Sequence, residues 1–355
     1  MKKLFKILIL VLVAVCCAAG LFACDNGGNG AKKTGLQYKM YEGDDYYTVY
    51  DYVKDGDETE LDIGSYNKDG VVIKRIKKGA FKDNDNLVKI TVPDTVEIID
   101  GGAFANMKAL KEITLPFIGH TPVADVGSVN SAPDDKATEK SVGNERNFGY
   151  IFGTEEYEGG VKCDQNYDAS NTSTYYLPDT LRKVNLTPKA SSEYGIPMYA
   201  FSGNAWVNEV VLSADVKAIG VAAFKDNVYA ATINLSGVEK IYDDAFNGAK
   251  NLIAADLTGL TEIKETCFKN CAALTTVGIN VDIPAGTFYG CANLTTVTIG
   301  ANVVNIGANA FYGCDAVTTI TVNGTNEWTV GTTPNVILNA ANVKNADYSI
   351  LKWSR

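Results

Sequence analysis

The sequence almost lacks histidine, a residue on which much catalytic chemistry depends. Among its 355 residues it has one histidine, His120, which excludes a three-histidine metal site and any chemistry built on a histidine pair. It also lacks a phosphate-binding P-loop, a G-x-S-x-G nucleophile motif and a dinucleotide fingerprint. A triad of His120 with a serine and an aspartate is formally available, but we expect His120 in a surface loop. We therefore predict that the protein is not an enzyme.

Cysteine is also scarce in the part of the chain that we expect to fold. Of the eight cysteines, Cys16 and Cys17 fall in an N-terminal apolar stretch and Cys24 follows it. The remaining five are odd in number, which is not typical of a disulfide framework, and no two of them form the C-x-x-C pair that is common in zinc sites. They are Cys163, Cys267, Cys271, Cys291 and Cys314. We expect buried, inert thiols, with no metal and no cofactor.

Basic residues are fewer than acidic residues. Lysine and arginine total 32 against 42 aspartates and glutamates, which gives a net charge of −10. Nucleic acid is therefore excluded as a partner, because binding to phosphates requires a basic face. Beyond the first twenty residues no apolar run approaches the roughly 20 residues that span a bilayer. The composition thus favours a solvated domain.

The N-terminus carries the features of a secretory signal. Three lysines lie in the first six residues, residues 7–19 are apolar, and the tetrad Leu21-Phe22-Ala23-Cys24 follows. This tetrad resembles the bacterial lipoprotein box. The resemblance implies that residues 1–23 are removed as a lipoprotein signal peptide. It also implies that a lipid on Cys24 anchors the secreted chain to the outer face of the bacterial membrane or cell surface. The alternative is an ordinary signal peptide with a cysteine there by chance.

A fixed period runs through the rest of the chain. Eight phenylalanines each follow a small residue, and neighbours in this series are 20–23 residues apart except for one gap of 97. They are Phe81, Phe104, Phe201, Phe224, Phe246, Phe268, Phe288 and Phe311. A second pattern, L-x-x-I-x-I, recurs in phase with the first, as in Leu87-x-x-Ile90-x-Val92. Self-similarity at this period predicts a leucine-rich-repeat solenoid.

The two patterns assign each half of a repeat to one wall of the solenoid. In the I-x-I triplet alternate side chains point inward, so stacked copies form short parallel strands on the concave face. The V-x-x-I-x-x-x-A-F half predicts irregular or short helical segments on the convex wall, where the phenylalanine rings stack into a spine. The units resemble the BspA-type leucine-rich repeats of bacterial surface proteins, and residues 90–104 are a near-complete copy. The resemblance implies adhesion to an extracellular protein or a neighbouring cell.

The period also sets the expected domain boundaries. Residues 24–44 are rich in Gly, Asn and Lys and predict a flexible tether. A single leucine-rich-repeat domain then covers residues 45–355. Its predicted parts are an N-terminal cap at 45–78, repeats at 79–323 with an insertion at 117–174, and a C-terminal cap at 324–355. The insertion contains the acidic pair Asp134 and Asp135 and an aromatic run.

Two surfaces are candidates for binding. The first consists of the outward side chains of the concave strands, and opposite charges on Lys89 and Glu112 are expected to face each other there. This candidate surface comprises Lys89, Thr91, Glu112, Thr114, Lys183, Asn185, Glu209, Val211, Asn234, Asp256, Thr276, Thr296, Thr298, Thr319 and Thr321. Thr and Asn also suit exposed strands that bind nothing. The second candidate is the aromatic run of the insertion, Phe148, Tyr150 and Phe152, which either packs on the flank of the solenoid or forms a recognition knob.

Three functions are compatible with these features. The favoured one is a lipid-anchored surface protein that binds an extracellular protein or glycan through the solenoid face, because curved solenoids offer extended surfaces. The second is a structural spacer without a dedicated ligand. The third is an enzyme that acts on glycans or peptides through the insertion. The oligomeric state is not predicted, and the fold alone does not decide among the three functions.

Overall fold

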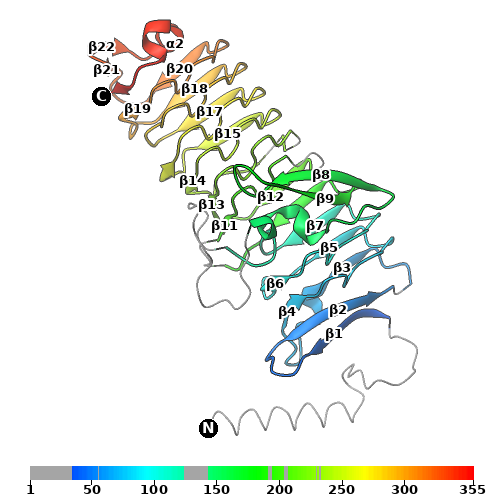
Figure 1. Cartoon of the computed structure of the whole chain (residues 1–355). Helices are drawn as coiled ribbons and strands as arrows, with labels where there is room; N and C mark the ends of the chain where they lie inside the picture. The colour runs from blue at the N-terminus through cyan, green and yellow to red at the C-terminus, as the bar shows by residue number, and fades with distance from the viewer. Residues whose placement is uncertain are drawn as a thin grey trace, which may run out of the picture.

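The structure, a computed structural model, describes residues 34–54, 56–123, 143–190, 194–203, 207–228, 230–231 and 233–355. In this part of the chain successive repeats stack into an elongated solenoid, with the first strands at one end and the C-terminus at the other (Figure 1). The predicted signal peptide, Cys24 and the acidic pair of the insertion lie outside the described residues.

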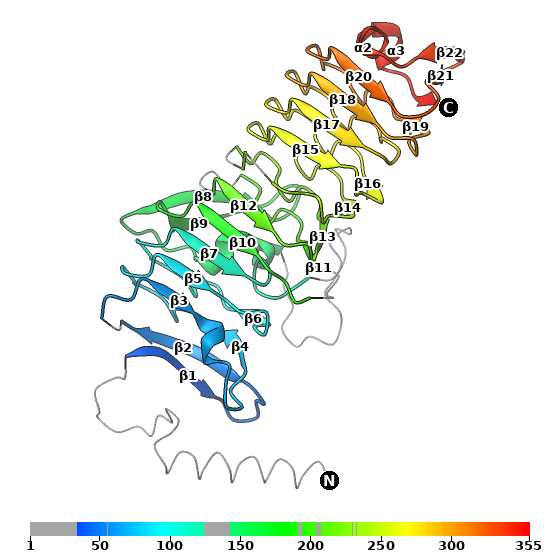
Figure 2. The ribbon, with the colours of Figure 1, turned by 180° about the vertical axis from the view of Figure 1, so that it is seen from behind.

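The I-x-I triplets form a row of parallel strands along the axis, which we call the first ladder. Its strands run side by side in Figure 2 and belong to two sheets, ordered β12-β10-β7-β5-β3 and β15-β17-β18-β20. Inward residues of adjacent strands pair in register, as Ile90 does with Ile113. The strands are β3 (Glu60–Asp62), β5 (Lys89–Thr91), β7 (Glu112–Leu115), β10 (Lys183–Leu186), β12 (Glu209–Leu212), β15 (Ala254–Leu257), β17 (Thr276–Ile279), β18 (Thr296–Ile299) and β20 (Thr319–Val322). The predicted solenoid with short parallel strands is confirmed.

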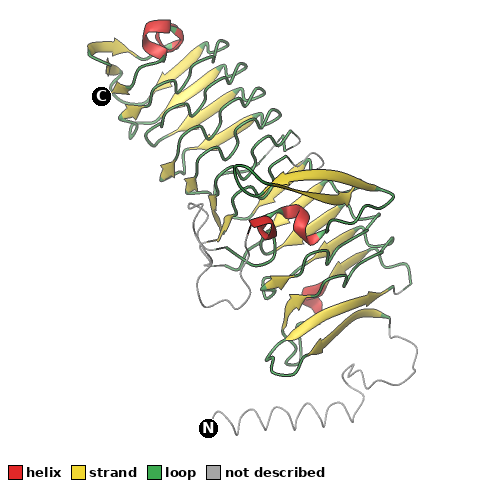
Figure 3. Cartoon of the chain, in the orientation of Figure 1, coloured by secondary structure: helices red, strands yellow, loops and turns green. Residues whose placement is uncertain are grey.

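The V-x-x-I segments form a second ladder of parallel strands of two to four residues, where the sequence predicted irregular or short helical segments. Its strands are β4 (Ile73–Ile76), β6 (Ile98–Ile99), β11 (Tyr194–Ile196), β13 (Val216–Ile219), β14 (Lys240–Ile241) and β16 (Glu262–Ile263). The sheet order β11-β13-β14-β16 joins four consecutive coils. In the described residues helical turns lie in the insertion and near the two ends of the chain (Figure 3).

Stacked phenylalanine rings form the predicted spine inside the solenoid. Phe224 is fully buried, with its ring centroid 5.0 Å from that of Phe201 and 5.1 Å from that of Phe246. The backbone follows the same spacing, because the Phe224 N–H donates to the carbonyl of Ala245 in the next coil. Each inner ring is thus held on both sides by its neighbours, and the core is continuous along the axis.

Two positions in each coil adopt the left-handed backbone conformation, two residues before and two residues after the phenylalanine. Position −2 is Gly79, Gly102, Tyr199, Ala222, Asp244, Thr266, Gly286 and Asn309; position +2 is Asp83, Asn106, Gly203, Asp226, Gly248, Asn270, Gly290 and Gly313. Gly, Asn and Asp dominate because other residues are strained at positive φ. These two turns fold the Ala-Phe segment sharply enough for the next coil to stack on it.

The described part of the insertion is built into the solenoid and does not project from it as a loop. Helical turns η2 (Gly143–Arg146) and η3 (Phe148–Ile151) are followed by an antiparallel hairpin of β8 (Gly160–Asn166) and β9 (Thr172–Pro178). Phe148 and Phe152 fill the gap in the spine between Phe104 and Phe201, with centroid distances of 5.1–6.4 Å along the series. The Phe148 N–H donates to the carbonyl of Ala200, as the N–H groups of Phe201 and Phe224 do to the coil that follows each. The insertion therefore supplies a missing coil.

Both ends of the solenoid are closed by irregular sheets. At the N-terminal end β1 (Gly35–Met40) pairs antiparallel with β2 (Tyr47–Val53), which pairs with β4. The predicted tether at 24–44 is therefore too long, because ordered strand begins at Gly35. At the C-terminal end Trp328 and Trp353 are buried. That end contains β19 (Asn305–Ile306), β21 (Glu327–Val330), β22 (Thr333–Ile337), β23 (Trp353–Ser354), α2 (Ala340–Lys344) and α3 (Ala346–Ser349).

Candidate binding surfaces

The outer face of the first ladder carries fourteen of the fifteen residues of the predicted binding surface, and Asn234 lies in the irregular segment between β12 and β15; none of the fifteen is buried. The burial pattern alternates within each strand, as in β12, where Glu209 and Val211 are exposed and the two residues between and after them are buried. This alternation arises because successive side chains of a strand point to opposite faces. Accessibility is thus established for these residues, whereas their role in binding stays a prediction.

The N-terminal half of this face is a ladder of alternating charge. Glu60, Lys89, Glu112, Lys183 and Glu209 lie opposite one another on five adjacent strands. The Lys183 ammonium is 3.4 Å from the Glu209 carboxylate, and the Lys89 ammonium is 4.0 Å from that of Glu60. Exposed pairs of this kind contribute roughly 0–1 kcal/mol each. Their main effect is to present a fixed pattern of alternating sign.

The C-terminal half of the face is almost uncharged. One row of threonine runs across β17, β18 and β20, with Thr296 opposite both Thr276 and Thr319. A second row joins Thr298 of β18 and Thr321 of β20. Asp256 on β15 carries a carboxylate, which accepts hydrogen bonds from the backbone and hydroxyl of Thr258. The two halves of the face therefore offer different chemistry, charged and complementary in one and hydroxyl-rich in the other.

The aromatic run of the insertion is not a recognition knob. Phe148 is fully buried and Phe152 is 1% exposed, so the prediction that these two residues contact a partner is wrong. Their rings belong to the spine. Tyr150 is partly accessible, and its ring lies against Gly101, where a Cβ atom would approach it to 2.9 Å. Of the three predicted contacts only Tyr150 is available to a ligand.

The hairpin of the insertion packs on the turns that carry the Ala-Phe pairs and leaves the outer face of the first ladder accessible. The Gln165 amide donates to the carbonyl of Ala200, and its side-chain oxygen accepts from the N–H of Gly149. In Figure 2, β8 and β9 lie behind β7, β10 and β12, whose outer faces are turned toward the viewer. Tyr175 is buried at this contact and donates to the carbonyl of Asn144, and burial raises its pKa to about 12.

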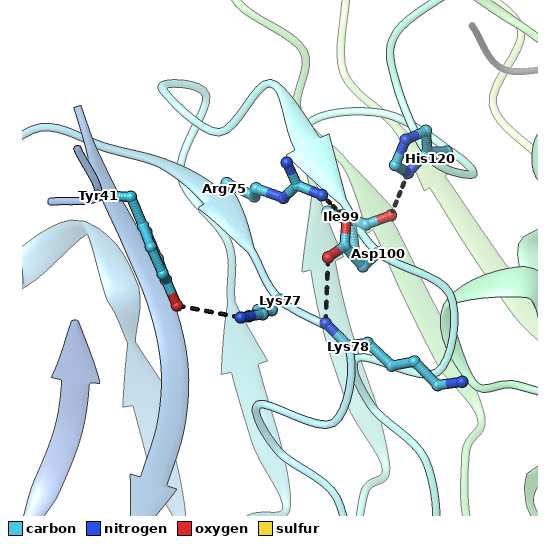
Figure 4. A network of polar contacts seen from close by, with 7 residues as sticks. All are labelled: Tyr41, Arg75, Lys77, Lys78, Ile99, Asp100 and His120. Atoms are coloured by element: carbon cyan, nitrogen blue, oxygen red, sulfur yellow. Dashed lines mark hydrogen bonds and ion pairs between the residues drawn. The ribbon is translucent and has the colours of Figure 1, made fainter. Parts of the chain in front are cut away.

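A cavity of about 500 Å³ lies where the insertion meets the second ladder. Arg75 donates to Asp100 at 2.9 Å, and the other oxygen of Asp100 accepts from the backbone of Lys78 at 3.3 Å (Figure 4). Lys82 donates to Glu155 of the insertion at 2.8 Å, and this hydrogen bond lowers the pKa of Glu155. The sequence patterns did not point to this cavity, because its residues come from segments far apart in the chain.

His120 also lines this cavity, although we expected it in a surface loop. It is 7% exposed, and its Nδ1 is 2.9 Å from the carbonyl oxygen of Ile99. Its own carbonyl accepts from the N–H of Ile99, so the His120 backbone continues the second ladder. The ring meets Tyr150 edge to face at 5.8 Å.

The cysteines are structural in the described part of the chain. All five are buried, and the thiols of Cys271, Cys291 and Cys314 donate to the carbonyls of Phe246, Phe268 and Phe288 in the preceding coil. Asn227 makes the corresponding bond to Phe201. Burial raises the pKa of the Cys267 thiol. No group of three or more His, Cys, Asp or Glu side chains is arranged to hold a metal among the residues described.

These features define a β-solenoid protein built from leucine-rich repeats, with an accessible ladder face and a cavity between its insertion and the second ladder. A family model described as BspA type leucine rich repeat region matches in six copies, over residues 73–120, 171–283, 194–318 and 281–332. The chain therefore belongs to the BspA-type leucine-rich repeat family, as its sequence predicted. No helix in the described residues is long and apolar enough to span a bilayer.

Solved structures similar to this chain are also leucine-rich repeat proteins. One is from Bacteroides ovatus, with 17% identity over 83% of this chain and 77% of the other and a TM-score of 0.36. A second is from Eubacterium ventriosum, with 18% identity over 81% and 83% and a TM-score of 0.33. A leucine rich cell surface protein from Faecalibacterium prausnitzii has 17% identity over 85% and 97% and a TM-score of 0.26. No curated protein gives a significant match.

Proposed function

We propose that the protein is displayed on the outside of a bacterial cell and binds an extracellular protein or glycan through the outer face of the first ladder. One observation carries the proposal: fifteen outward side chains stay accessible while the described part of the insertion and both end sheets pack elsewhere. An extended solenoid face suits a large partner, because it can engage many weak contacts at once. Family membership supports the same role.

Anchoring through a lipid on Cys24 is part of the proposal. The position of Cys24 directly after the apolar segment supports it. Mass spectrometry of the protein from cell membranes is expected to show an N-terminal acylated cysteine. In a Cys24→Ser variant the protein should leave the membrane fraction. An unmodified Cys24 in membrane-bound protein would refute the anchor and leave the binding proposal intact.

Paired charge swaps test the binding face without removing an ion pair. In Lys183→Glu/Glu209→Lys the 3.4 Å pair is rebuilt with its polarity reversed, but the new carboxylate at position 183 faces Glu112 on the other neighbouring strand, so stability should fall by about 1 kcal/mol. The matched control is Lys217→Glu/Glu239→Lys, which reverses a 3.2 Å pair on the second ladder. Partners are sought on extracellular-matrix proteins and on glycan arrays with the chain from residue 24, carrying Cys24→Ser. We expect saturable binding that the first swap weakens and the control does not.

A structural spacer is the alternative, and the internal pairing of the charged rows favours it. If neither screen yields a saturable partner, or if both swaps bind equally well, the ladder face is not a binding surface and the spacer function stands.

A further inference from the structure

We propose that the cavity beside the insertion is a second binding site, for a carboxylated sugar such as a uronic or sialic acid. It is separate from the first ladder, since the cavity is lined by the second ladder, the adjoining turns and the insertion. Its volume, about 500 Å³, is in the range of small-molecule sites. The site therefore goes beyond the proposed function and can be tested without it.

The floor of the cavity is left open by glycine. Gly79 and Gly102 occupy the −2 turn position, which in five of the other six coils carries a side chain: Tyr199, Ala222, Asp244, Thr266 and Asn309. A Cβ atom on Gly79 would have its first neighbour, the Lys82 Cβ, at 3.8 Å, so packing does not demand glycine there. Gly102 lies against Gly153 of the insertion. The backbone thus borders the cavity at a position where five other coils carry a side chain.

The walls combine fixed hydrogen-bonding groups with an aromatic ring. Asp100 is held by Arg75 and by the backbone of Lys78, and its side chain is 15% exposed, so its carboxylate is positioned before any ligand arrives. Tyr150 adds a partly buried ring. A sugar ring presents hydroxyls that both donate and accept, together with C–H faces that pack on aromatic rings, and this lining offers a match for each.

The charge of the lining favours an acid over a neutral sugar. Three cationic side chains, Arg75, Lys78 and Lys82, face two carboxylates, in a chain whose net charge is −10. Arg75 and Lys82 each form an ion pair with one of the two acids. In Figure 4 the Lys78 ammonium points away from the Arg75–Asp100 pair. Its charge remains in excess and can be matched by one carboxylate of a ligand.

The test uses D-glucuronic acid and N-acetylneuraminic acid as probes, with glucose and acetate as controls, in calorimetry and ligand-observed NMR. The protein is the chain from residue 24 with Cys24→Ser. We expect saturable binding of at least one acid, about tenfold tighter than glucose or acetate. The comparison of D-glucuronic acid with N-acetylneuraminic acid shows which of the two acidic sugars the cavity binds. Equal binding of glucose, binding of acetate as tight as that of either acid, or no saturation by either acid would overturn the proposal.

Two variants connect such binding to the cavity. Lys78→Gln should weaken the acidic sugar about fivefold and leave glucose unchanged, because only the charge is lost. Gly79→Asn should abolish binding by filling the floor, and the fold should be kept, because Asn309 takes the same backbone position in another coil. Lys217→Gln on the second ladder is the control. Binding that survives Gly79→Asn in a protein with an unchanged circular dichroism spectrum places the ligand elsewhere and contradicts the site.

Discussion

The phenylalanine spine makes a quantitative prediction about position along the solenoid. Replacing Phe224 by alanine removes a fully buried ring with two stacked neighbours, at 5.0 and 5.1 Å. Truncating a buried phenylalanine costs about 3–5 kcal/mol, and we expect the upper end, because both ring contacts are lost. Each coil contacts only its neighbours, so a break in the middle uncouples the two halves of the molecule.

Phe311 offers the matched comparison at the end of the spine. It is 3% exposed and stacks on Phe288 alone in the series, at 5.3 Å. Phe311→Ala should therefore cost less than Phe224→Ala and mainly loosen the C-terminal end. Urea unfolding followed by circular dichroism measures the whole solenoid, and hydrogen exchange locates the loss. An unchanged unfolding midpoint for Phe224→Ala, or a larger loss for Phe311→Ala, would refute the idea of a continuous core. Phe224→Asp should prevent folding altogether.

Three further changes follow from individual contacts. Ala222→Gly relieves a positive φ of 52°, so the free energy of unfolding should stay within about 1 kcal/mol of the parent value. Ala223→Gly, at the next position, should lower the free energy of unfolding by about 1–2 kcal/mol. Equal losses for the two variants in chemical denaturation would argue against strain at position −2. The unfolded protein ionises Tyr175 near pH 10 while the folded protein does so only near pH 12, so the free energy of unfolding should fall by about 2–3 kcal/mol between these values. Tyr175→Phe should flatten that fall, and an unchanged pH dependence would contradict it. The Arg355 guanidinium donates to the carbonyls of Val303, Gly300 and Ala301 and lies 4.8 Å from the centroid of the Trp328 ring. Arg355→Ala should therefore destabilise the C-terminal end by about 2–3 kcal/mol, which faster hydrogen exchange in that region would show. Unchanged protection of these amides would refute the prediction.

The repeated half of the fold could be predicted because its signals are redundant. The Ala-Phe pair and the L-x-x-I-x-I pattern recur in phase, and both mark positions that the structure buries, such as Phe246 and Ile299. The second ladder could not be predicted as a sheet. Strands of two residues, such as β14 and β16, place one side chain inward, which is too short for an alternation to be seen.

The insertion was harder to predict because its coil breaks the repeat rules. Phe148 follows Asn147 where the eight phenylalanines of the repeat pattern follow a smaller side chain, and its segment is a 3-10 turn. A spacing of 44 residues from Phe104, twice the repeat length, was the one available signal. The strand β1 was hidden in a different way, since the Gly- and Lys-rich residues before it suggested a tether. The alternation of apolar and polar residues in Leu36-Gln37-Tyr38 was a signal for a strand.

The outward rows of the first ladder follow from the strand period alone, and the structure places them as predicted. The cavity does not follow from any local pattern. Arg75, Asp100 and Tyr150 come from three segments, and the packing of Tyr150 onto Gly101 brings them together. Such a site depends on how the insertion docks, which the sequence did not reveal.

The most direct test of the proposed function compares the two charge-swapped variants against a partner that saturates the parent protein. The dissociation constants of the parent, Lys183→Glu/Glu209→Lys and Lys217→Glu/Glu239→Lys are measured side by side. We predict a loss of about tenfold or more for the first variant and none for the second. Equal affinities for all three would show that the ladder face does not contact the partner.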